Sequence, residues 1–331
     1  MNRTVSLLSF SSEAEHAGGG GSLGSRVLGG SPLECGGFRE PGGTSCGRGG
    51  ASRHPASRLP ALDLLRGLNL LSMIAYHGAY DLVYLYGVDI PGYRGLPGYL
   101  WQQSICWIFI FLSGFCFCLG RFDGARRIRR GLLLSACGLL ITAVTALIMP
   151  ESLILMGVLS FFGLAVLLTV PLYPLLVRIP AYAGLAGCLL LFFLTRDVSS
   201  GWLGFEGLRL LALPDFLYHG VFPMILGFPW PGFFSTDYFA LLPWIFLFWS
   251  GFFTFRCFCG KKERRPVENV PEAVPEDGKA APEPAVLFLR AGGRSLCAPL
   301  EYIGRHTLPI YMIHQPALMA VFLLLQAAGI L

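Results

Sequence analysis

The chain has 331 residues, of which 54% are hydrophobic and only 14% are charged, and its formal net charge is +5. Soluble domains usually carry about 25% charged residues, so this composition excludes a large soluble protein and indicates an integral membrane protein. The small net charge indicates no partner by itself, because the placement of the charges matters more.

Two polar segments flank or interrupt the apolar part of the chain. The first, residues 1–57, is rich in Gly, Ser and Arg and has few large apolar residues. It cannot bury enough surface to offset its ordering entropy, so we expect a disordered tail before a membrane domain at 58–331. It lacks the apolar core and cleavage site of a signal peptide. The second, 260–288, is rich in Pro and charge and predicts a mobile cytoplasmic linker.

Between these segments, apolar runs recur at about the length that crosses a bilayer, which is about 20 residues. They predict an all-α polytopic membrane helix bundle. The stretch 196–236 contains four prolines and Asp215, which favours a re-entrant or interfacial hairpin, although an eighth span stays open. The seven predicted spans are 62–86, 100–119, 131–149, 152–175, 180–195, 237–255 and 306–330.

The positive charges predict the orientation, because cytoplasmic loops are enriched in Lys and Arg. The 120–130 loop holds five arginines, and the segment 256–265 that follows the sixth span holds three arginines and two lysines. The alternate loops are poor in positive charge. This pattern predicts an integral cell-membrane protein with a cytoplasmic N-terminus and an external C-terminus.

The first predicted span carries ionisable side chains that membrane helices usually lack. At about 100° per residue, Asp63, Arg66, His77 and Asp81 share a stripe roughly 60° wide, and Tyr84 joins it. Charges cost about 2.5–3.5 kcal/mol each on the insertion scale, so they persist mainly where they face partners or a wet cavity. The stripe therefore predicts that this helix lines a site.

Within this stripe, His77 and Asp81 are four residues apart, so their side chains can meet. A carboxylate beside an imidazole orients it and raises its basicity, as a general base requires. The alternative is a buried polar pair that only fixes helix packing, and we favour the functional interpretation. Asp63 and Arg66, a turn apart near the cytoplasmic end, could instead form an ordinary interfacial ion pair.

Two further candidates lie in later spans. His314 is followed by Gln315 and Pro316, and the proline loosens the helix and makes room for a polar pocket. A hydrogen-bonded packing histidine is the alternative. Asp237 enters the sixth span from the outside, at the depth of His77, where it could bind a hydroxylated acceptor. The alternative there is a simple aromatic anchor at the interface.

Other features point to no second chemistry. The ten cysteines lack C-x-x-C spacing and are interpreted as small buried hydrophobic residues rather than metal ligands or disulfides. The basic run 126–130 could attract cofactor phosphates, but a positive-inside anchor explains it better. The sequence contains no Gly-rich phosphate loop, zinc motif or nucleic-acid module. We therefore expect no metal, no haem and no nucleic-acid partner.

The residues of the stripe also resemble a known pattern. Asp63-x-x-Arg66-Gly67, with His77 eleven residues after the arginine, resembles the first helix of the transmembrane acyltransferase superfamily. The segments MGVLSFFGLAVLL (156–168), STDYFALLPWIFLF (235–248) and YIGRHTLPIYMIHQP (302–316) are similar to bacterial proteins that carry the heparan-α-glucosaminide N-acetyltransferase catalytic domain. The resemblance covers about residues 58–330.

This resemblance implies transfer of an acetyl group from cytoplasmic acetyl-CoA to an acceptor, often a sugar, at the other face. It also implies a histidine near the first helix that acts as acyl carrier or general base. In the lysosomal relative that histidine follows the helix, whereas this chain has no histidine between His77 and His219. His77 is therefore the candidate by the superfamily pattern.

The resulting hypothesis is a membrane acyltransferase with acetyl-CoA as co-substrate and a small-molecule or glycan acceptor. Membrane lipid is a further partner, and a homo-oligomer stays open. His77 and Asp81 are the candidate catalytic residues. The candidate binding residues are Asp63, Arg66, Tyr84, Asp237 and His314. The main alternative is a transporter or proton-coupled channel that uses the same stripe. A haem carrier with His77 and His314 as axial ligands is a weaker alternative.

Overall fold

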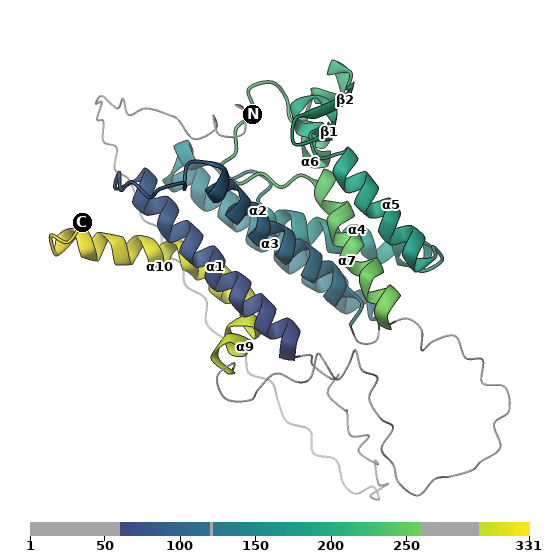
Figure 1. Cartoon of the computed structure of the whole chain (residues 1–331), viewed down its shortest axis with the longest axis horizontal. Coiled ribbons are helices and arrows are strands. Elements are labelled where there is room, and N and C mark those ends of the chain that lie inside the picture. Colours follow the sequence, from purple (N-terminus) through teal and green to yellow (C-terminus); the bar gives the residue numbers. More distant parts are fainter. Residues whose placement is uncertain (1–59, 120–121, 260–297) are drawn as a thin grey trace, which may run out of the picture. The chain divides into compact units, whose positions relative to one another are not determined.

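The computed structural model describes residues 60–119, 122–259 (without the side chain of Cys259) and 298–331. The predicted tail at 1–57 and the predicted linker at 260–288 lie outside these residues. The described chain is almost entirely helical, with one β-hairpin (Figure 1).

Each predicted span coincides with one long helix, which confirms the all-α membrane bundle. These helices are α1 (Pro60–Tyr84), α2 (Leu96–Phe117), α3 (Gly124–Ile148), α4 (Val158–Leu176), α5 (Ala181–Leu194), α7 (Leu241–Cys259) and α10 (Thr307–Ala327). The shorter helical elements are η2 (Pro150–Ser152), η3 (Val198–Ser200), η4 (Asp215–Tyr218), α6 (Val221–Leu226) and α9 (Ala298–Arg305).

The long helices differ in how well they suit a bilayer. Within the described residues, five are long and apolar enough to cross a membrane, namely α2, α3, α4, α7 and α10. Helix α1 has 25 residues, but its composition includes the charged residues of the predicted stripe. Helix α5 is apolar but has only 14 residues. The bundle is therefore that of an integral membrane protein, with α1 as its polar member.

The proline-containing stretch between α5 and α7 forms no eighth span. Strands β1 (Trp202–Phe205) and β2 (Leu208–Ala212) pair in antiparallel fashion, and η4 and α6 follow. Glu206 and Gly207 connect the strands with φ values of +49° and +95°. Both central residues of a type I′ turn need positive φ, so this local geometry explains the tight hairpin.

Four helices share a large apolar interior, which we call the aromatic core. Helices α2, α4, α5 and α7 surround it, and its fully buried members include Phe161, Phe192, Phe248, Phe252 and Phe253. Helices α2 and α7 approach closely because glycines face the opposite backbone. A Cβ atom built on Gly114 would lie 1.7 Å from the carbonyl oxygen of Phe248, so only glycine fits this crossing.

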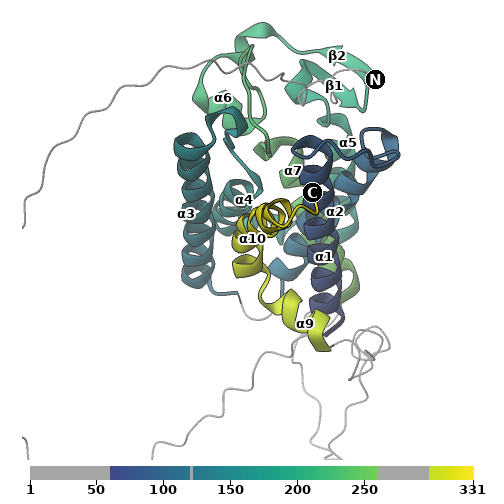
Figure 2. The ribbon, with the colours of Figure 1, turned by 90° about the vertical axis from the view of Figure 1, so that its left-hand side faces the viewer.

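A second packing unit joins the two ends of the sequence. Helix α1 contacts α9 and α10, which follow it by more than 200 residues, and Figures 1 and 2 both show the yellow helices beside α1. The crossing of α1 and α9 is again built on glycine. Cβ atoms on Gly67 and Gly304 would lie 2.1 Å and 1.8 Å from the carbonyl oxygens of Leu300 and Asp63. We call this unit the polar seam.

The helix ends separate into two groups. Arg66 at the start of α1 interacts electrostatically with Cys116 near the end of α2 and with Arg130 near the start of α3. We call this group the arginine-rich end, and its described members include Arg66, Arg127, Arg130, Arg256 and Arg305. The β-hairpin occupies the hairpin end, where Tyr99 near the start of α2 donates to Glu206 at 2.6 Å.

Candidate functional site

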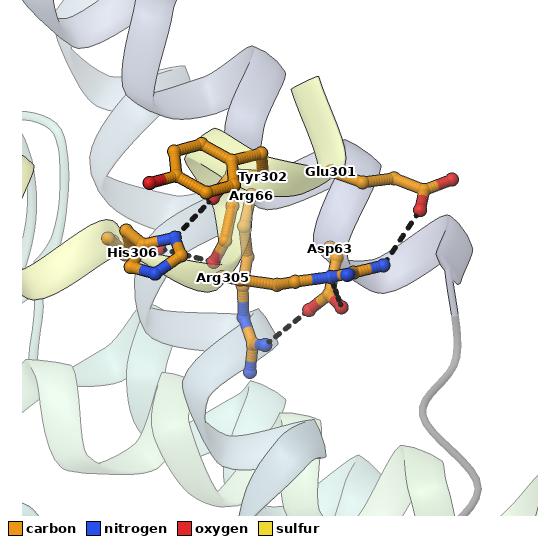
Figure 3. A network of polar contacts seen from close by, with 8 residues as sticks. Asp63, Arg66, Glu301, Tyr302, Arg305 and His306 are labelled. Atoms are coloured by element: carbon orange, nitrogen blue, oxygen red, sulfur yellow. Dashed lines mark hydrogen bonds and ion pairs between the residues drawn. The ribbon is translucent and has the colours of Figure 1, made fainter. Parts of the chain in front are cut away.

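The predicted polar stripe of α1 faces the polar seam. At the arginine-rich end, Asp63 is buried and accepts from Arg66 Nη1 at 3.3 Å. Its second carboxylate oxygen lies 3.4 Å from Arg305 Nε, and Arg305 also pairs with Glu301 at 3.0 Å (Figure 3). One carboxylate thus bridges two guanidinium groups and joins α1 to α9.

Two imidazoles meet further along the seam. The ring centroids of His77 on α1 and His314 on α10 lie 5.0 Å apart, with the ring planes tilted by 54°. The edge of the Tyr76 ring lies against His77 at 5.9 Å. Sequence reasoning could not show that these two helices touch, and the structure brings both predicted histidines together.

His314 has one engaged and one unengaged ring nitrogen. Its Nδ1 is hydrogen-bonded to the backbone carbonyl of Tyr311. A carbonyl only accepts, so Nδ1 carries the proton and Nε2 is left with an acceptor lone pair. That Nε2 is buried, and no described residue supplies it with a hydrogen bond. Unpaired buried polar atoms are rare in folded proteins, so this nitrogen marks a place for a ligand donor.

Asp81 makes a different contact from the predicted one. It is 2% exposed, and both carboxylate oxygens accept from Gln315 Nε2, at 3.1 and 3.2 Å. Among the described residues, no hydrogen bond or ion pair joins Asp81 to His77, so the predicted polarisation of the imidazole by this carboxylate is not present. An amide from α10 satisfies the buried charge, which the backbone of α1 cannot do because its N–H groups are used within the helix.

Tyr84 lies apart from the imidazoles, toward the hairpin end of α1. Its ring packs against Tyr80 with a centroid distance of 4.6 Å, and the Arg94 guanidinium lies 5.4 Å from its centroid. Seven residues separate Tyr84 from His77, which is about 10 Å along a helix. Tyr84 therefore lies at the hairpin end of the predicted stripe, away from the two imidazoles.

Asp237 lies before α7 at the hairpin end, and it caps another helix. Its Oδ2 accepts from the backbone N–H of Val158, the first residue of α4, at 3.3 Å. Desolvation by burial raises the pKa of the Asp237 carboxyl to about 6. Tyr311 and Cys106 both interact electrostatically with this carboxylate. The Tyr311 ring also lies 5.3 Å from the His314 ring between centroids, so Asp237 and His314 both interact with this tyrosine.

Sequence reasoning missed several residues of this arrangement. Gln315 stands next to His314 in the chain, so its position was a usable signal, although nothing in the sequence indicated Asp81 as its partner. Arg305 and Tyr311 lie in the quoted segment 302–316 but were given no role. Cys106 on α2 carried no signal beyond its apolar surroundings. No group of three or more His, Cys, Asp or Glu residues in the described chain could hold a metal ion.

A groove opens beside His314, lined mainly by α10 and on one side by Ile74 of α1. Its volume is about 360 Å³, and every lining residue but His314 is apolar. The lining residues are Ile74, Pro309, Ile310, Ile313, His314, Ala317, Leu318 and Val321. The rim includes Ile313, which is 62% exposed, and Val321, which is 51% exposed. The groove is therefore an apolar, lipid-compatible space that His314 borders.

The fold and the site define a class of protein, an integral membrane helix bundle with a buried two-histidine seam. The family model "Heparan-alpha-glucosaminide N-acetyltransferase, catalytic" matches residues 58–276. This is well over half of the chain, and the chain belongs to this family, which confirms the resemblance seen in the sequence. The match includes His77, Asp81 and Asp237, whereas His314 lies beyond it. No curated protein and no solved structure matches the chain significantly. Family membership places the chain among the membrane acetyltransferases.

Proposed function

We propose that this membrane protein transfers an acetyl group from acetyl-CoA to a hydroxyl or amine of a small-molecule or glycan acceptor. The observation that supports this most is the contact between His77 and His314, at 5.0 Å between ring centroids, inside the polar seam. Imidazoles are the commonest general bases, and here two converge from helices that are distant in sequence. The family name is that of an N-acetyltransferase and supports the same chemistry.

In this proposal His77 is the general base. It takes the proton from the acceptor hydroxyl or amine, whose oxygen or nitrogen attacks the thioester carbonyl. The bond from the acetyl carbon to the acceptor forms, the carbon–sulfur bond breaks, and the CoA thiolate leaves. His314 uses its free Nε2 lone pair to hold a second donor of the acceptor. Asp81 acts through Gln315 and fixes α10 against α1, so it positions His314.

The donor would approach from the arginine-rich end. Positive loops face the cytoplasm, so we propose that this end is cytoplasmic, which places the N-terminus inside and the C-terminus outside. Arg66 and His77 are eleven residues apart, about 16 Å along a helix, and an extended phosphopantetheine arm can span that distance. Arg66 would hold donor phosphate, while Asp63 keeps its guanidinium oriented through the ion pair at 3.3 Å.

The acceptor would bind toward the hairpin end. Asp237 and Tyr84 lie on that side of the imidazoles, and Asp237 shares Tyr311 as a neighbour with His314. A carboxylate and a phenol are suitable partners for sugar hydroxyls. The two substrates would then reach the histidines from opposite ends of the bundle, as transfer across a membrane requires.

The test compares two histidines in purified protein that is supplied with labelled acetyl-CoA. His77→Ala should lower acetyl transfer about 10²-fold or more, which is the usual contribution of a general base. His306→Ala is the matched control, because His306 is exposed just before α10 and its ring bonds the carbonyl of Tyr302 on α9, away from the two imidazoles. Equal transfer by His77→Ala and wild type would refute the assignment. Substrate flux in proteoliposomes without any acetyl transfer would favour a transporter instead.

A further inference from the structure

The lining of the apolar groove beside His314 restricts the chemical class of molecule that can bind there, and the proposed function does not specify that class. Seven of its eight lining residues lie on α10 and Ile74 lies on α1, and its rim includes the exposed apolar side chains of Ile313 and Val321. A free sugar would lose its hydrogen bonds to water against such a lining, which is costly. Hydrocarbon, in contrast, enters without losing any polar contact.

One polar side chain, that of His314, borders the same groove. His314 is 9% exposed, and its Nε2 has no hydrogen-bond partner in the described chain. With Nδ1 bonded to the Tyr311 carbonyl, Nε2 can only accept. An O–H or N–H group next to a hydrocarbon chain would supply Nε2 with the partner that it lacks. The His77 ring lies 5.0 Å from the His314 ring between centroids, so a donor group held at His314 would be near the proposed base.

We infer that the acceptor is membrane-anchored, a hydroxyl- or amine-bearing headgroup carried on a hydrocarbon chain that lies in the groove between α1 and α10. This inference rests on the proposed function and names its acceptor class. The groove residues on α10 run from Pro309 to Val321, about 18 Å of helix.

The acetyl donor suits the groove less well. A CoA thioester carries phosphates, which need cations, whereas no charged side chain lines the groove. The described arginines near the seam, Arg66 and Arg305, lie at the arginine-rich end instead. The groove and the arginines thus separate a hydrocarbon-bearing substrate from a phosphate-bearing one.

The first experiment varies only the chain of the acceptor. The full-length protein in phosphatidylcholine nanodiscs receives labelled acetyl-CoA with methyl, hexyl or dodecyl β-glucosaminide, which present the same hydroxyls and amine. The expected kcat/KM rises by about tenfold or more from methyl to dodecyl, because methylenes in an apolar pocket add binding energy. Equal values for the three acceptors would overturn the inference and leave the proposed function standing.

The second experiment fills the groove. Ala317→Trp places a large side chain among the lining residues, and Ala320→Trp is the matched control, since Ala320 is also exposed on α10 but lies outside the lining. Ala317→Trp should raise KM for the dodecyl acceptor about tenfold and leave KM for the methyl acceptor unchanged. A parallel loss for both acceptors would contradict the inference.

A third readout does not depend on turnover. A dodecyl β-glucosaminide with a diazirine in its chain should label peptides of α1 and α10, and labelling should fall in Ala317→Trp but not in Ala320→Trp. Labelling elsewhere, or stronger labelling of the groove by a diazirine analogue of hexadecanoyl-CoA, would overturn the inference and assign the groove to a donor chain. If no acceptor is acetylated while groove labelling persists, the proposed function fails and the hydrocarbon site remains.

Discussion

The aromatic core and the polar seam differ in where their buried polar groups find hydrogen-bond partners. In the core, hydroxyls are satisfied within their own helices, as Thr169 donates to the Ala165 carbonyl at 2.6 Å and Ser250 to the Leu247 carbonyl at 2.7 Å. In the seam, Asp63 and Asp81 need partners from α9 and α10. The buried hydroxyl protons of the core therefore need no acceptor from another helix, whereas the buried carboxylates of the seam gain these partners only when α1 meets α9 and α10.

The two regions also differ in how many buried polar atoms remain without a hydrogen-bond partner. Of the three buried side-chain atoms without a partner in the described chain, two belong to the seam, His314 Nε2 and Gln315 Oε1, and the third is Ser135 Oγ. A membrane helix bundle gains most by satisfying such atoms internally. Their persistence next to two imidazoles indicates that the seam is arranged for a ligand rather than for stability alone.

The largest effect should come from disrupting the core. Gly114→Ala places a Cβ atom 1.7 Å from the Phe248 carbonyl oxygen, so α2 and α7 must separate. We expect loss of the folded bundle, or a destabilisation at or above the ~3 kcal/mol upper end for overpacking, measured by thermal unfolding in detergent. Gly187→Ala is the control, because nothing lies within 4 Å of its Cβ position. Equal stability of the two variants would contradict this account of the crossing.

The same change in the seam should separate activity from folding. Gly67→Ala places a Cβ atom 2.1 Å from the Leu300 carbonyl oxygen and displaces α9 from α1. Because the aromatic core does not include this crossing, the protein should stay monodisperse while acetyl transfer falls about tenfold or more, since a displacement of 1 Å can cost 10²-fold in catalysis. If Gly67→Ala unfolded as completely as Gly114→Ala, the core and the seam would be one cooperative unit.

The pair formed by Asp81 and Gln315 gives a more specific test, with a smaller expected change in stability. Gln315→Leu leaves a buried carboxylate without its donor and should cost about 1–3 kcal/mol in the free energy of unfolding. The double variant Asp81→Leu/Gln315→Leu removes both polar groups and should recover much of that loss. Gln326→Leu, at an exposed position of α10, should change little. Thermal unfolding of these variants, of Asp81→Leu and of the wild type completes the cycle, and additive losses would argue against a direct pair.

Much of this architecture was predictable because membrane spans leave strong signals. Seven apolar runs gave seven helices, and the stripe at 100° per residue placed Asp63, His77 and Asp81 on the face that packs against α9 and α10. The contact of α1 with α10 was not predictable, since it joins His77 to a residue 237 positions later. Helical spacing made Asp81 a partner for His77, but the competing amide of Gln315 comes from another helix. Periodicity carries no information about such a donor.

The smallest expected effect concerns the hairpin end and pH. Burial raises the pKa of Asp237 from 3.8 to about 6. The stability that depends on the protonated carboxyl is therefore fully present below about pH 4 and is lost as the pH rises through about 6. Asp237→Asn keeps an acceptor for the Val158 N–H but cannot titrate. Its unfolding temperature should exceed that of the wild type at about pH 7, and the difference should shrink toward about pH 4. A pH-independent difference would contradict the assigned burial of this charge.

Arg256 shows that an arginine that contributes to the positive-inside pattern can also stabilise the end of a helix. It donates to three carbonyl oxygens, those of Leu176, Val177 and Ile179, at 2.8–2.9 Å, and so completes the C-terminus of α4. A lysine there would count equally in the positive-inside rule, but it lacks the planar fork that reaches several carbonyls at once. Insertion direction and helix termination can therefore be separated at one position, since Arg256→Lys should insert correctly and still fray α4.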